Sequence, residues 1–337
     1  MGVLGQLKFL LFGFLPDQFS SKLPVTHVDL TGRSFVVTGS NTGLGLATAI
    51  HLARMKPALL ILAVRDLKKG MVAKDQVIAE TGFAGRLEVW ELDMADFGSV
   101  KRFVEMVNTL ERLDGAILNA GINVPSWDVT VDGWEKTFQV NMLATGLLGV
   151  LLLPLLKKTS QLPLPYPDAH ELPPHLTITG SGAQFLALFP EKKAPEILKA
   201  LNDESKSIKR DRYPTSKLLL ILFARSLAKL PSAEGVVVNV TDPGLCISSI
   251  GSEYNLSSFA MFLVRRVAWT TTKGALNLVY AVLTPTPSGA YISSCEVRKT
   301  TPWSRSDDGM RVQDKVWDEM VDVWRGVSSD VENIAKP

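Results

Sequence analysis

The feature that most constrains this chain is an alternation, from residue 34 onward, of short continuous apolar runs with longer helix-like stretches. Seven runs have the length and composition of buried strands, at residues 34–38, 58–64, 87–92, 115–118, 175–180, 236–241 and 290–293. Apolar strands separated by helices indicate a parallel sheet that is covered on both faces. Because crossovers between parallel strands are right-handed, the pattern predicts a doubly wound α/β fold, with a mainly parallel seven-stranded sheet in three αβα layers.

The length and composition fit a single domain. The chain has 337 residues, of which 46% are hydrophobic and 21% are charged, so it can bury a sizeable core. We expect an apolar arm over residues 1–30, a main domain over residues 31–325 and a tail over residues 326–337. Residues 190–212 are rich in charge and are expected to form a solvated surface insertion.

Charge and residue types exclude several classes of partner. The formal net charge is +2, which is too balanced to favour nucleic acid. The four histidines and two cysteines do not have metal-ligand spacing, so no metal site is expected. Two cysteines in so long a chain are also not a disulfide framework, and they fit a reducing compartment.

The N-terminal region contains a short apolar run, FLLFGFL, at residues 9–15. The run is shorter than the roughly 20 residues of a membrane span. It is not followed by the cleavage site of a secretory signal, so the protein is not expected to be secreted. We expect an arm packed on the body of the protein; docking of residues 1–20 on a membrane surface stays open as an alternative. The longer apolar run at residues 142–156 is expected to be a buried helix.

A glycine-rich turn follows the first predicted strand. Its sequence is Thr38-Gly39-Ser40-Asn41-Thr42-Gly43-Leu44-Gly45. Glycine permits the left-handed backbone of a tight turn and lets the backbone approach a pyrophosphate closely. The helix expected to start near Gly43 would direct free N–H groups and its positive dipole end at that anion. The turn therefore predicts a dinucleotide-binding site, although its glycine spacing differs from G-x-G-x-x-G.

The end of the second predicted strand indicates which dinucleotide is bound. Arg65 lies there, where an acidic residue would bind the 2′-hydroxyl of NAD and an arginine would pair with the 2′-phosphate of NADP. Arg65 therefore favours NADP(H). Asp66 is adjacent and is the alternative, because its carboxylate would favour NAD(H).

A tyrosine and a lysine begin a later apolar helix, in Tyr213-Pro214-Thr215-Ser216-Lys217. Residues four apart lie on one face of a helix. A nearby ammonium stabilises a phenolate, so Lys217 would lower the pKa of Tyr213 and allow proton exchange near neutral pH. The pattern is common by itself. Here Ser181 follows another strand end, where it can hold a substrate oxygen, and Asn141 is placed to bind a water that leads to Lys217.

These motifs together resemble the short-chain dehydrogenase/reductase family over residues 30–295, which implies a Rossmann-type fold. The resemblance rests on the glycine turn, Asn119-Ala120-Gly121, Asn141, Ser181, Tyr213 with Lys217, and Pro243-Gly244. Within the family, the chain is similar to the retinol-dehydrogenase-like branch, especially to fungal members found with secondary-metabolite pathways. Residues 312–317, VQDKVW, are one phrase that suggests this branch.

The resemblance implies a role for each matched residue. Tyr213 is the proton donor or acceptor, and Lys217 also binds the nicotinamide ribose. Ser181 orients the carbonyl or alcohol, and Asn141 holds a proton-relay water. The remaining cofactor-binding residues are Gly39, Asn41, Thr42, Gly43, Leu44, Gly45, Arg65, Asp93, Asn119, Pro243 and Gly244.

The sequence therefore predicts an NADP(H)-dependent oxidoreductase that interconverts a carbonyl and an alcohol on a hydrophobic small molecule. A reductase step in secondary-metabolite synthesis is favoured, in a cytoplasmic protein; the oligomeric state stays open, with a homodimer as one alternative. A membrane-surface retinol or lipid dehydrogenase is the first alternative, and a non-catalytic nucleotide-binding regulator is the second. The substrate loop is expected at residues 245–270, which are largely apolar.

Overall fold

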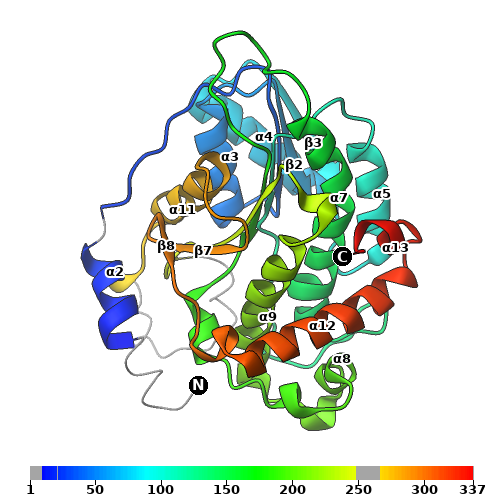
Figure 1. Ribbon diagram of the computed structural model, residues 1–337. Coiled ribbons are helices and arrows are strands. Elements are labelled where there is room, and N and C mark those ends of the chain that lie inside the picture. Colours follow the sequence, from blue (N-terminus) through cyan, green and yellow to red (C-terminus); the bar gives the residue numbers. More distant parts are fainter. Residues whose placement is uncertain (1–9, 21, 248–265, 337) are drawn as a thin grey trace.

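The centre of the molecule is an eight-stranded sheet with the order β3-β2-β1-β4-β5-β6-β7-β8 (Figure 1). The computed structural model describes residues 10–20, 22–247 and 266–336. The strands are β1 (Ser34–Thr38), β2 (Leu59–Val64), β3 (Arg86–Glu91), β4 (Gly115–Leu118), β5 (His175–Thr179), β6 (Val237–Asp242), β7 (Ala290–Ser293) and β8 (Glu296–Arg298). Neighbouring strands from β3 to β7 are parallel, and this confirms the predicted doubly wound α/β fold.

The predicted number of strands was wrong by one, because β8 adds an antiparallel edge strand to β7. The two residues between β7 and β8, Ser294 and Cys295, both have positive φ angles, of 54° and 57°. A two-residue hairpin turn of this kind usually contains Asn-Gly or Asp-Gly, and this chain has neither there. All three residues of β8 are exposed, so the strand also lacks an apolar pattern that the sequence could reveal.

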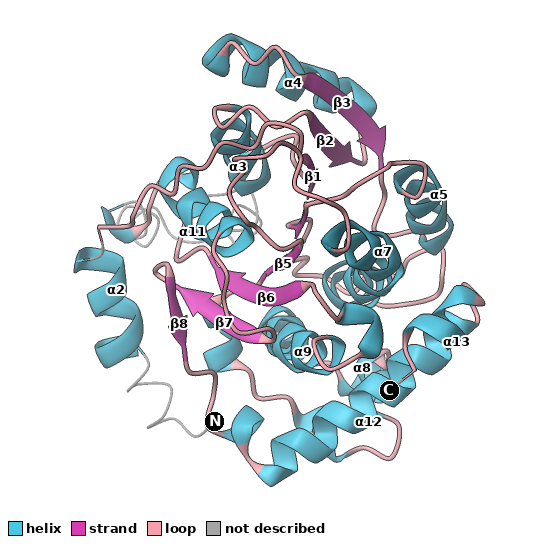
Figure 2. Ribbon diagram, turned by 45° about the horizontal axis from the view of Figure 1, so that its top comes forward, coloured by secondary structure: helices cyan, strands magenta, loops and turns pink. Residues whose placement is uncertain are grey.

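Helices cover both faces of the sheet (Figure 2). On one face lie α3 (Gly43–Ala53), α4 (Leu67–Thr81) and α11 (Thr271–Leu283). On the other lie α5 (Phe97–Val107), α7 (Thr145–Ser160) and α9 (Arg212–Leu227), with α12 (Asp307–Arg325) and α13 (Asp330–Ile334) outside them. The short helices are the π-helices Leu10–Phe14 and Gln139–Ala144, α2 (Leu15–Ser20), α6 (Lys136–Phe138), α8 (Ile197–Leu201), and the 3-10 turns Gly182–Leu186, Pro190–Lys193, Glu204–Lys206, Lys209–Asp211, Pro231–Ala233 and Trp303–Arg305.

The two faces of the sheet have separate hydrophobic cores because side chains alternate along each strand. In β1, Phe35 and Val37 join the core under α3 and α11, whereas Val36 joins the core under α5, α7 and α9. The continuous helical segment Lys136–Ser160 is apolar enough to cross a membrane, but 94% of its most apolar stretch is buried inside the protein. The predicted buried helix at residues 142–156 is therefore confirmed.

The charged segment at residues 190–212 is not the solvated excursion that its composition suggested. Its helix α8 buries Ile197, Leu198 and Leu201. The backbone N–H groups of Ile197 and Leu198 donate to the carboxylate of Glu319 on α12, at 2.9 and 2.7 Å. The interpretation failed because a few apolar residues at helical spacing are outnumbered by charged neighbours in the sequence.

Candidate active site

The carboxyl ends of β1 and β4 meet at the centre of the sheet, where the strand order reverses. The Thr38 hydroxyl accepts hydrogen bonds from the backbone N–H groups of Asn119 and Ala120, both at 2.9 Å. The Asn119 side-chain amide donates to the Thr38 carbonyl at 2.9 Å. These bonds hold the two strand ends together at the topological switch point, where doubly wound proteins bind their ligands.

The glycine turn joins β1 to α3 with the backbone that its sequence predicts. Gly39 and Gly43 have φ angles of +64° and +62°. A Cβ atom at Gly45 would lie 2.4 Å from the Gly39 carbonyl oxygen, so the helix can pack against the turn only with glycine there. A Cβ at Gly43 would meet nothing within 4 Å, so this glycine borders open space at the N-terminus of α3. An N-terminus of this kind, open and free of side chain, suits a pyrophosphate.

A groove of about 220 Å³ runs along this switch point. Eight of the predicted cofactor-binding residues line it: Gly39, Asn41, Thr42, Gly43, Leu44, Arg65, Asp93 and Asn119. Gly45 lies behind them, where it packs against Gly39 and Asn119. Sequence reasoning missed Lys136, which lines the same groove from α6 and whose ammonium is paired with the Asp128 carboxylate at 2.7 Å. The residues present therefore fit a dinucleotide.

Arg65 lies where β2 ends and lines both this groove and a second, open hollow. The hollow also contains Lys68 and Lys69, two cations that sequence reasoning did not single out. Asp66 begins α4, and its carboxylate accepts a hydrogen bond from the backbone N–H of Lys69 at 3.1 Å. Asp66 thus caps a helix. The hollow has three basic side chains, of Arg65, Lys68 and Lys69, against two acidic ones, of Asp66 and Glu91, so a phosphate can be bound there.

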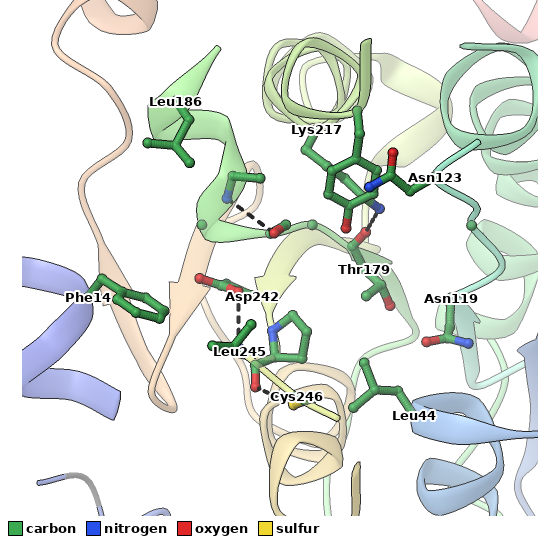
Figure 3. Close-up of a pocket in the computed structure, with 18 residues that line it drawn as sticks. Phe14, Leu44, Asn119, Asn123, Thr179, Leu186, Lys217, Asp242, Leu245 and Cys246 are labelled. Carbon is green, nitrogen blue, oxygen red and sulfur yellow. Dashed lines mark hydrogen bonds between the residues drawn. The ribbon is translucent and has the colours of Figure 1, made fainter. Parts of the chain in front are cut away.

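A second cavity of about 350 Å³ adjoins the groove, and both are lined by Leu44, Asn119 and Gly121. Besides Leu44 and Asn119, this cavity brings together five more predicted site residues from three segments of the chain: Ser181, Tyr213, Lys217, Pro243 and Gly244. Figure 3 shows Lys217 in this cavity, near Thr179 and Asn123. Its volume is within the range of small-molecule sites. The strand ends of β5 and β6 and the start of α9 therefore meet beside the cofactor groove.

The Lys217 ammonium is buried at the back of this cavity. It donates a hydrogen bond to the Thr179 carbonyl at 2.8 Å and lies 5.6 Å from the centre of the Tyr213 ring. Burial lowers the pKa of Lys217 to about 8, and the carboxylate of Asp242 acts in the opposite direction. Lys217 is therefore positively charged at neutral pH and loses its proton in mildly alkaline solution.

Ser181 follows β5 with an extended backbone, and its hydroxyl accepts a hydrogen bond from the N–H of Ala183 at 3.1 Å. This bond leaves the hydroxyl proton for another acceptor. The side chain comes from the strand end next to β6, so it shares the cavity with Tyr213 and Lys217. Ser181 can thus donate to an oxygen bound in the cavity.

Asn141 lies within the π-helix Gln139–Ala144 and is not one of the residues that line the cavity. Its side chain pairs with both backbone groups of Ile122, each at 2.8 Å, and donates to the Ser216 hydroxyl at 3.1 Å. A Cβ at Gly121 would contact the Asn141 amide oxygen at 3.2 Å and the Lys217 nitrogen at 3.7 Å. Asn141 thus joins β4 to α9 close to Lys217.

Asp242 is a buried carboxyl group that sequence reasoning missed. It accepts hydrogen bonds from the N–H of Gly244 and from the Tyr291 hydroxyl, both at 3.0 Å. Burial raises the pKa of Asp242, and these hydrogen bonds oppose the change. The available signal was its place at a strand end directly before Pro243, in the motif that the sequence analysis did single out.

The walls of the cavity are mostly apolar, and they come from segments that are far apart in the sequence. They include Phe14, Leu186, Leu245 and Cys246, together with Leu44 on the cofactor side. Burial raises the pKa of Cys246 to about 12, so its thiol is not a nucleophile. The substrate loop predicted at residues 245–270 falls mainly on residues 248–265, which lie outside the described part of the chain.

Known proteins are similar to this chain in both sequence and fold. A family model for short chain dehydrogenases matches residues 33–161. The short chain dehydrogenase/reductase dmxR8 of Cryptosporiopsis sp. (strain 8999) is 38% identical over 92% of this chain and 95% of its own length. The short-chain dehydrogenase anuD of Penicillium roqueforti (strain FM164) is 34% identical over 92% of this chain and 82% of its own.

Among solved structures, an uncharacterized protein of Mycobacterium paratuberculosis has a TM-score of 0.64 and 26% identity, and the match covers 90% of this chain and 97% of that one. A short chain dehydrogenase of Escherichia coli CFT073, solved in complex with NADPH, has the same fold, with a TM-score of 0.56 and 21% identity over 79% of this chain and 98% of that one. The sequence matches and the arrangement of the site agree, and the chain belongs to the short-chain dehydrogenase/reductase family.

Proposed function

We propose that the protein is an NADP(H)-dependent reductase that converts a ketone or aldehyde on a hydrophobic small molecule into an alcohol. One observation carries the proposal: Ser181, Tyr213 and Lys217 line a mainly apolar cavity that opens onto the dinucleotide groove. A carbonyl compound in the cavity would therefore lie beside the nicotinamide end of a dinucleotide in the groove.

In this proposal the cofactor supplies the hydride, and the chain binds the substrate and moves the proton. Ser181 donates a hydrogen bond to the carbonyl oxygen and orients it. Tyr213 gives its phenolic proton to the same oxygen as negative charge develops there. The Lys217 ammonium, 5.6 Å from the ring centre, stabilises the phenolate that remains. In the reverse reaction the Tyr213 phenolate takes the proton from the alcohol oxygen.

The other predicted site residues keep supporting roles. Lys217 also binds the nicotinamide ribose, and Pro243 and Gly244 border the nicotinamide. Asp93 contacts the adenine, and Asn119 supports β4 beside the cofactor. Asn141 holds the relay water through an oxygen acceptor beside Lys217, because both of its amide N–H groups already donate, to Ile122 and Ser216. These roles are those that the family resemblance implies.

The choice of NADP(H) rests on Arg65 and its basic neighbours Lys68 and Lys69. Their charges complement a 2′-phosphate, whereas the Asp66 carboxylate, which would favour NAD(H), already accepts a helix-cap hydrogen bond from the N–H of Lys69. The Escherichia coli relative bound to NADPH is consistent with this choice.

The cellular role follows from the cofactor and the relatives. NADPH favours reduction, and several similar proteins are fungal short-chain dehydrogenases, so we propose a reductase step in secondary-metabolite synthesis. A cytoplasmic location stays a prediction. Homodimer formation and membership of the retinol-dehydrogenase-like branch stay predictions.

The test is a carbonyl panel assayed by NADPH oxidation, with the Tyr213→Phe variant beside the wild type. Wild-type protein should oxidise NADPH with at least one apolar ketone or aldehyde. Tyr213→Phe should lower turnover by ~10²–10⁴-fold, the usual contribution of a positioned proton donor, while NADPH still binds. Tyr280→Phe on α11 serves as the matched control and should keep full activity.

Two outcomes oppose the proposal. Substantial turnover by Tyr213→Phe would show that another group donates the proton. NADPH binding without oxidation by any carbonyl would instead support the non-catalytic regulator.

A further inference from the structure

The N-terminal helix α2 contains one side chain that is far more buried than its neighbours. Gln18 is only 4% exposed, whereas the next residue, Phe19, is 67% exposed. In Figure 1, α2 lies beside β8, near the edge of the sheet. An ion pair of Asp17 with Arg298 on β8, at 3.5 Å, joins the helix to that edge. A buried glutamine on a terminal helix needs polar partners, and their identity carries the argument.

The Gln18 side chain bonds to the backbone of two segments that are remote in sequence. Its amide nitrogen donates to the carbonyl oxygens of Leu245, at 3.0 Å, and Val267, at 2.9 Å. Its amide oxygen accepts from the N–H of Leu245 at 3.1 Å. The backbone carbonyl of Gln18 also accepts from the indole N–H of Trp269, at 2.8 Å. The side-chain amide of Gln18 therefore bonds to the backbone of both segments, in the way that a backbone amide of a neighbouring strand would.

These two segments are themselves joined, and they border the substrate cavity. The N–H of Trp269 donates to the Leu245 carbonyl at 2.8 Å, and the N–H of Ile247 donates to the Trp269 carbonyl at 3.0 Å. A Cβ at Gly244 would lie 2.9 Å from the Trp269 ring and 3.2 Å from the Gln18 amide oxygen. Gln18 and Trp269 thus hold Gly244 and Leu245, two residues that line the cavity, from behind.

Phe14, just before α2, lines the cavity itself. Figure 3 shows its ring directed toward Asp242 and Leu245, on the side opposite Asn119 and the cofactor groove. An aromatic ring is a broad, flat apolar surface that pairs well with other rings. The nearby Leu11 and Phe19 are exposed, so the apolar residues of this segment divide between the cavity and the surface.

We propose that residues 14–18 are a working part of the substrate site, in which Phe14 sets specificity and Gln18 is a positioning residue. Phe14 forms the wall that receives the body of the substrate, and it favours carbonyl compounds that contain rings over small aliphatic ones. Gln18 fixes Gly244 and Leu245 in the place where they meet that body. The inference rests on the proposed reductase function and names the substrate class of the same cavity.

The kinetic test compares a ring-containing ketone with a short aliphatic aldehyde in the wild type, Phe14→Ala, Gln18→Leu and the matched control Phe19→Ala. Phe14→Ala should lower kcat/KM for the ring ketone by ~10-fold or more, the effect of losing one buried aromatic contact. For the aldehyde, the change should be below ~2-fold. Gln18→Leu should raise KM for the ring ketone much more than it lowers kcat. The Kd for NADPH should stay unchanged in Phe14→Ala, and Phe19→Ala should behave as the wild type.

Hydrogen exchange at the Leu245 amide supplies a readout that needs no turnover. Removing the Gln18 acceptor should speed exchange there in Gln18→Leu by ~10-fold or more, while Phe19→Ala leaves it unchanged. Equal losses for both substrates in Phe14→Ala, or unchanged Leu245 exchange in Gln18→Leu, would overturn the inference. A wild type that reduces neither substrate nor any of the wider panel would count against the reductase function instead, and Leu245 exchange would still decide the role of Gln18.

Discussion

The dinucleotide groove and the substrate cavity share Leu44, Asn119 and Gly121, but the rest of their walls are built differently. The groove is formed largely by the ends of β1, β2, β3 and β4, and its centre is a glycine turn with open space before a helix. The cavity takes its walls from Phe14, the turn after β5, the start of α9 and the turn after β6. The groove therefore depends on backbone shape, whereas the cavity depends on side chains from distant segments.

This difference separates what the family holds in common from what an individual member can vary. A pyrophosphate is common to NAD(H) and NADP(H), and a backbone cradle at a helix N-terminus recognises it with little help from side chains. A substrate differs from one member to another, and side chains such as Phe14 and Leu186 can change without disturbing the sheet. Substitutions in the two regions should therefore fail in different ways.

The largest effect is expected from Gly43→Ala in the groove. Its φ angle of +62° is unfavourable for alanine, and the new methyl would project into the open space that we assign to the pyrophosphate. NADPH affinity should fall by more than ~100-fold, since a close backbone approach is lost. Equilibrium titration of NADPH fluorescence measures it.

Gly82→Ala is the matched control, because Gly82 ends α4 with a φ angle of +64° and also has open space around it. Both variants should lose ~1–2 kcal/mol of stability from the left-handed backbone. Only Gly43→Ala should lose cofactor. Equal NADPH affinity in the two variants would contradict the assignment of the groove.

A smaller and more selective effect is expected from Arg65→Ala. Removing one charge-assisted contact to a 2′-phosphate should weaken NADPH by ~10–100-fold and leave NADH nearly unchanged. Steady-state kinetics with both cofactors measures the ratio. Arg102→Ala, which removes an exposed arginine from α5, should change neither cofactor. Equal loss with NADH and NADPH would mean that Arg65 does not read the phosphate.

The smallest effect is expected from Asp242→Asn, which keeps the shape of the side chain and removes its charge. Lys217 has a pKa of about 8 in the folded protein, and the Asp242 carboxylate raises that value. Because the ammonium form is the active one, kcat/KM should decline as the pH rises through about 8. Without the carboxylate the pKa of Lys217 falls, so the decline should move to lower pH, by up to about one unit.

A pH–rate profile of kcat/KM measures this shift, and Tyr291→Phe is a useful second variant. That change removes the hydroxyl that donates to Asp242 at 3.0 Å but keeps the carboxylate. It should leave the alkaline decline of kcat/KM at higher pH than Asp242→Asn does. A decline that stays in place in Asp242→Asn would show that Asp242 does not act on Lys217.

The sequence could predict the groove well because its residues lie in short local motifs, namely the glycine turn and the residues that follow the strand ends. The glycine turn, the strand pattern and the spacing of Tyr213 and Lys217 each depend on neighbours within a few positions. Arg65 was found because it directly follows the second predicted strand. Such local patterns are fixed by backbone conformation, and the structure keeps most of them in the groove and cavity.

The features that the sequence analysis did not predict depend on contacts between residues that are far apart in the chain. Gln18 and Leu245 are 227 positions apart, and nothing near either of them in the sequence indicates the bond. Strand β8 was missed because its turn residues, Ser294 and Cys295, are unusual at positive φ angles. Asp242 was within reach, since it precedes Pro243, but its burial beside Lys217 requires the assembled sheet.

The central claim is that the cavity holds a carbonyl compound beside the cofactor in the groove. NADPH with deuterium at both C4 positions of its nicotinamide tests this most directly, by mass spectrometry of the alcohol formed. The account predicts one deuterium on the carbinol carbon of the wild-type product, and a yield at least ~100-fold lower from Tyr213→Phe under the same conditions. An alcohol without deuterium, or equal yield from the variant, would contradict it.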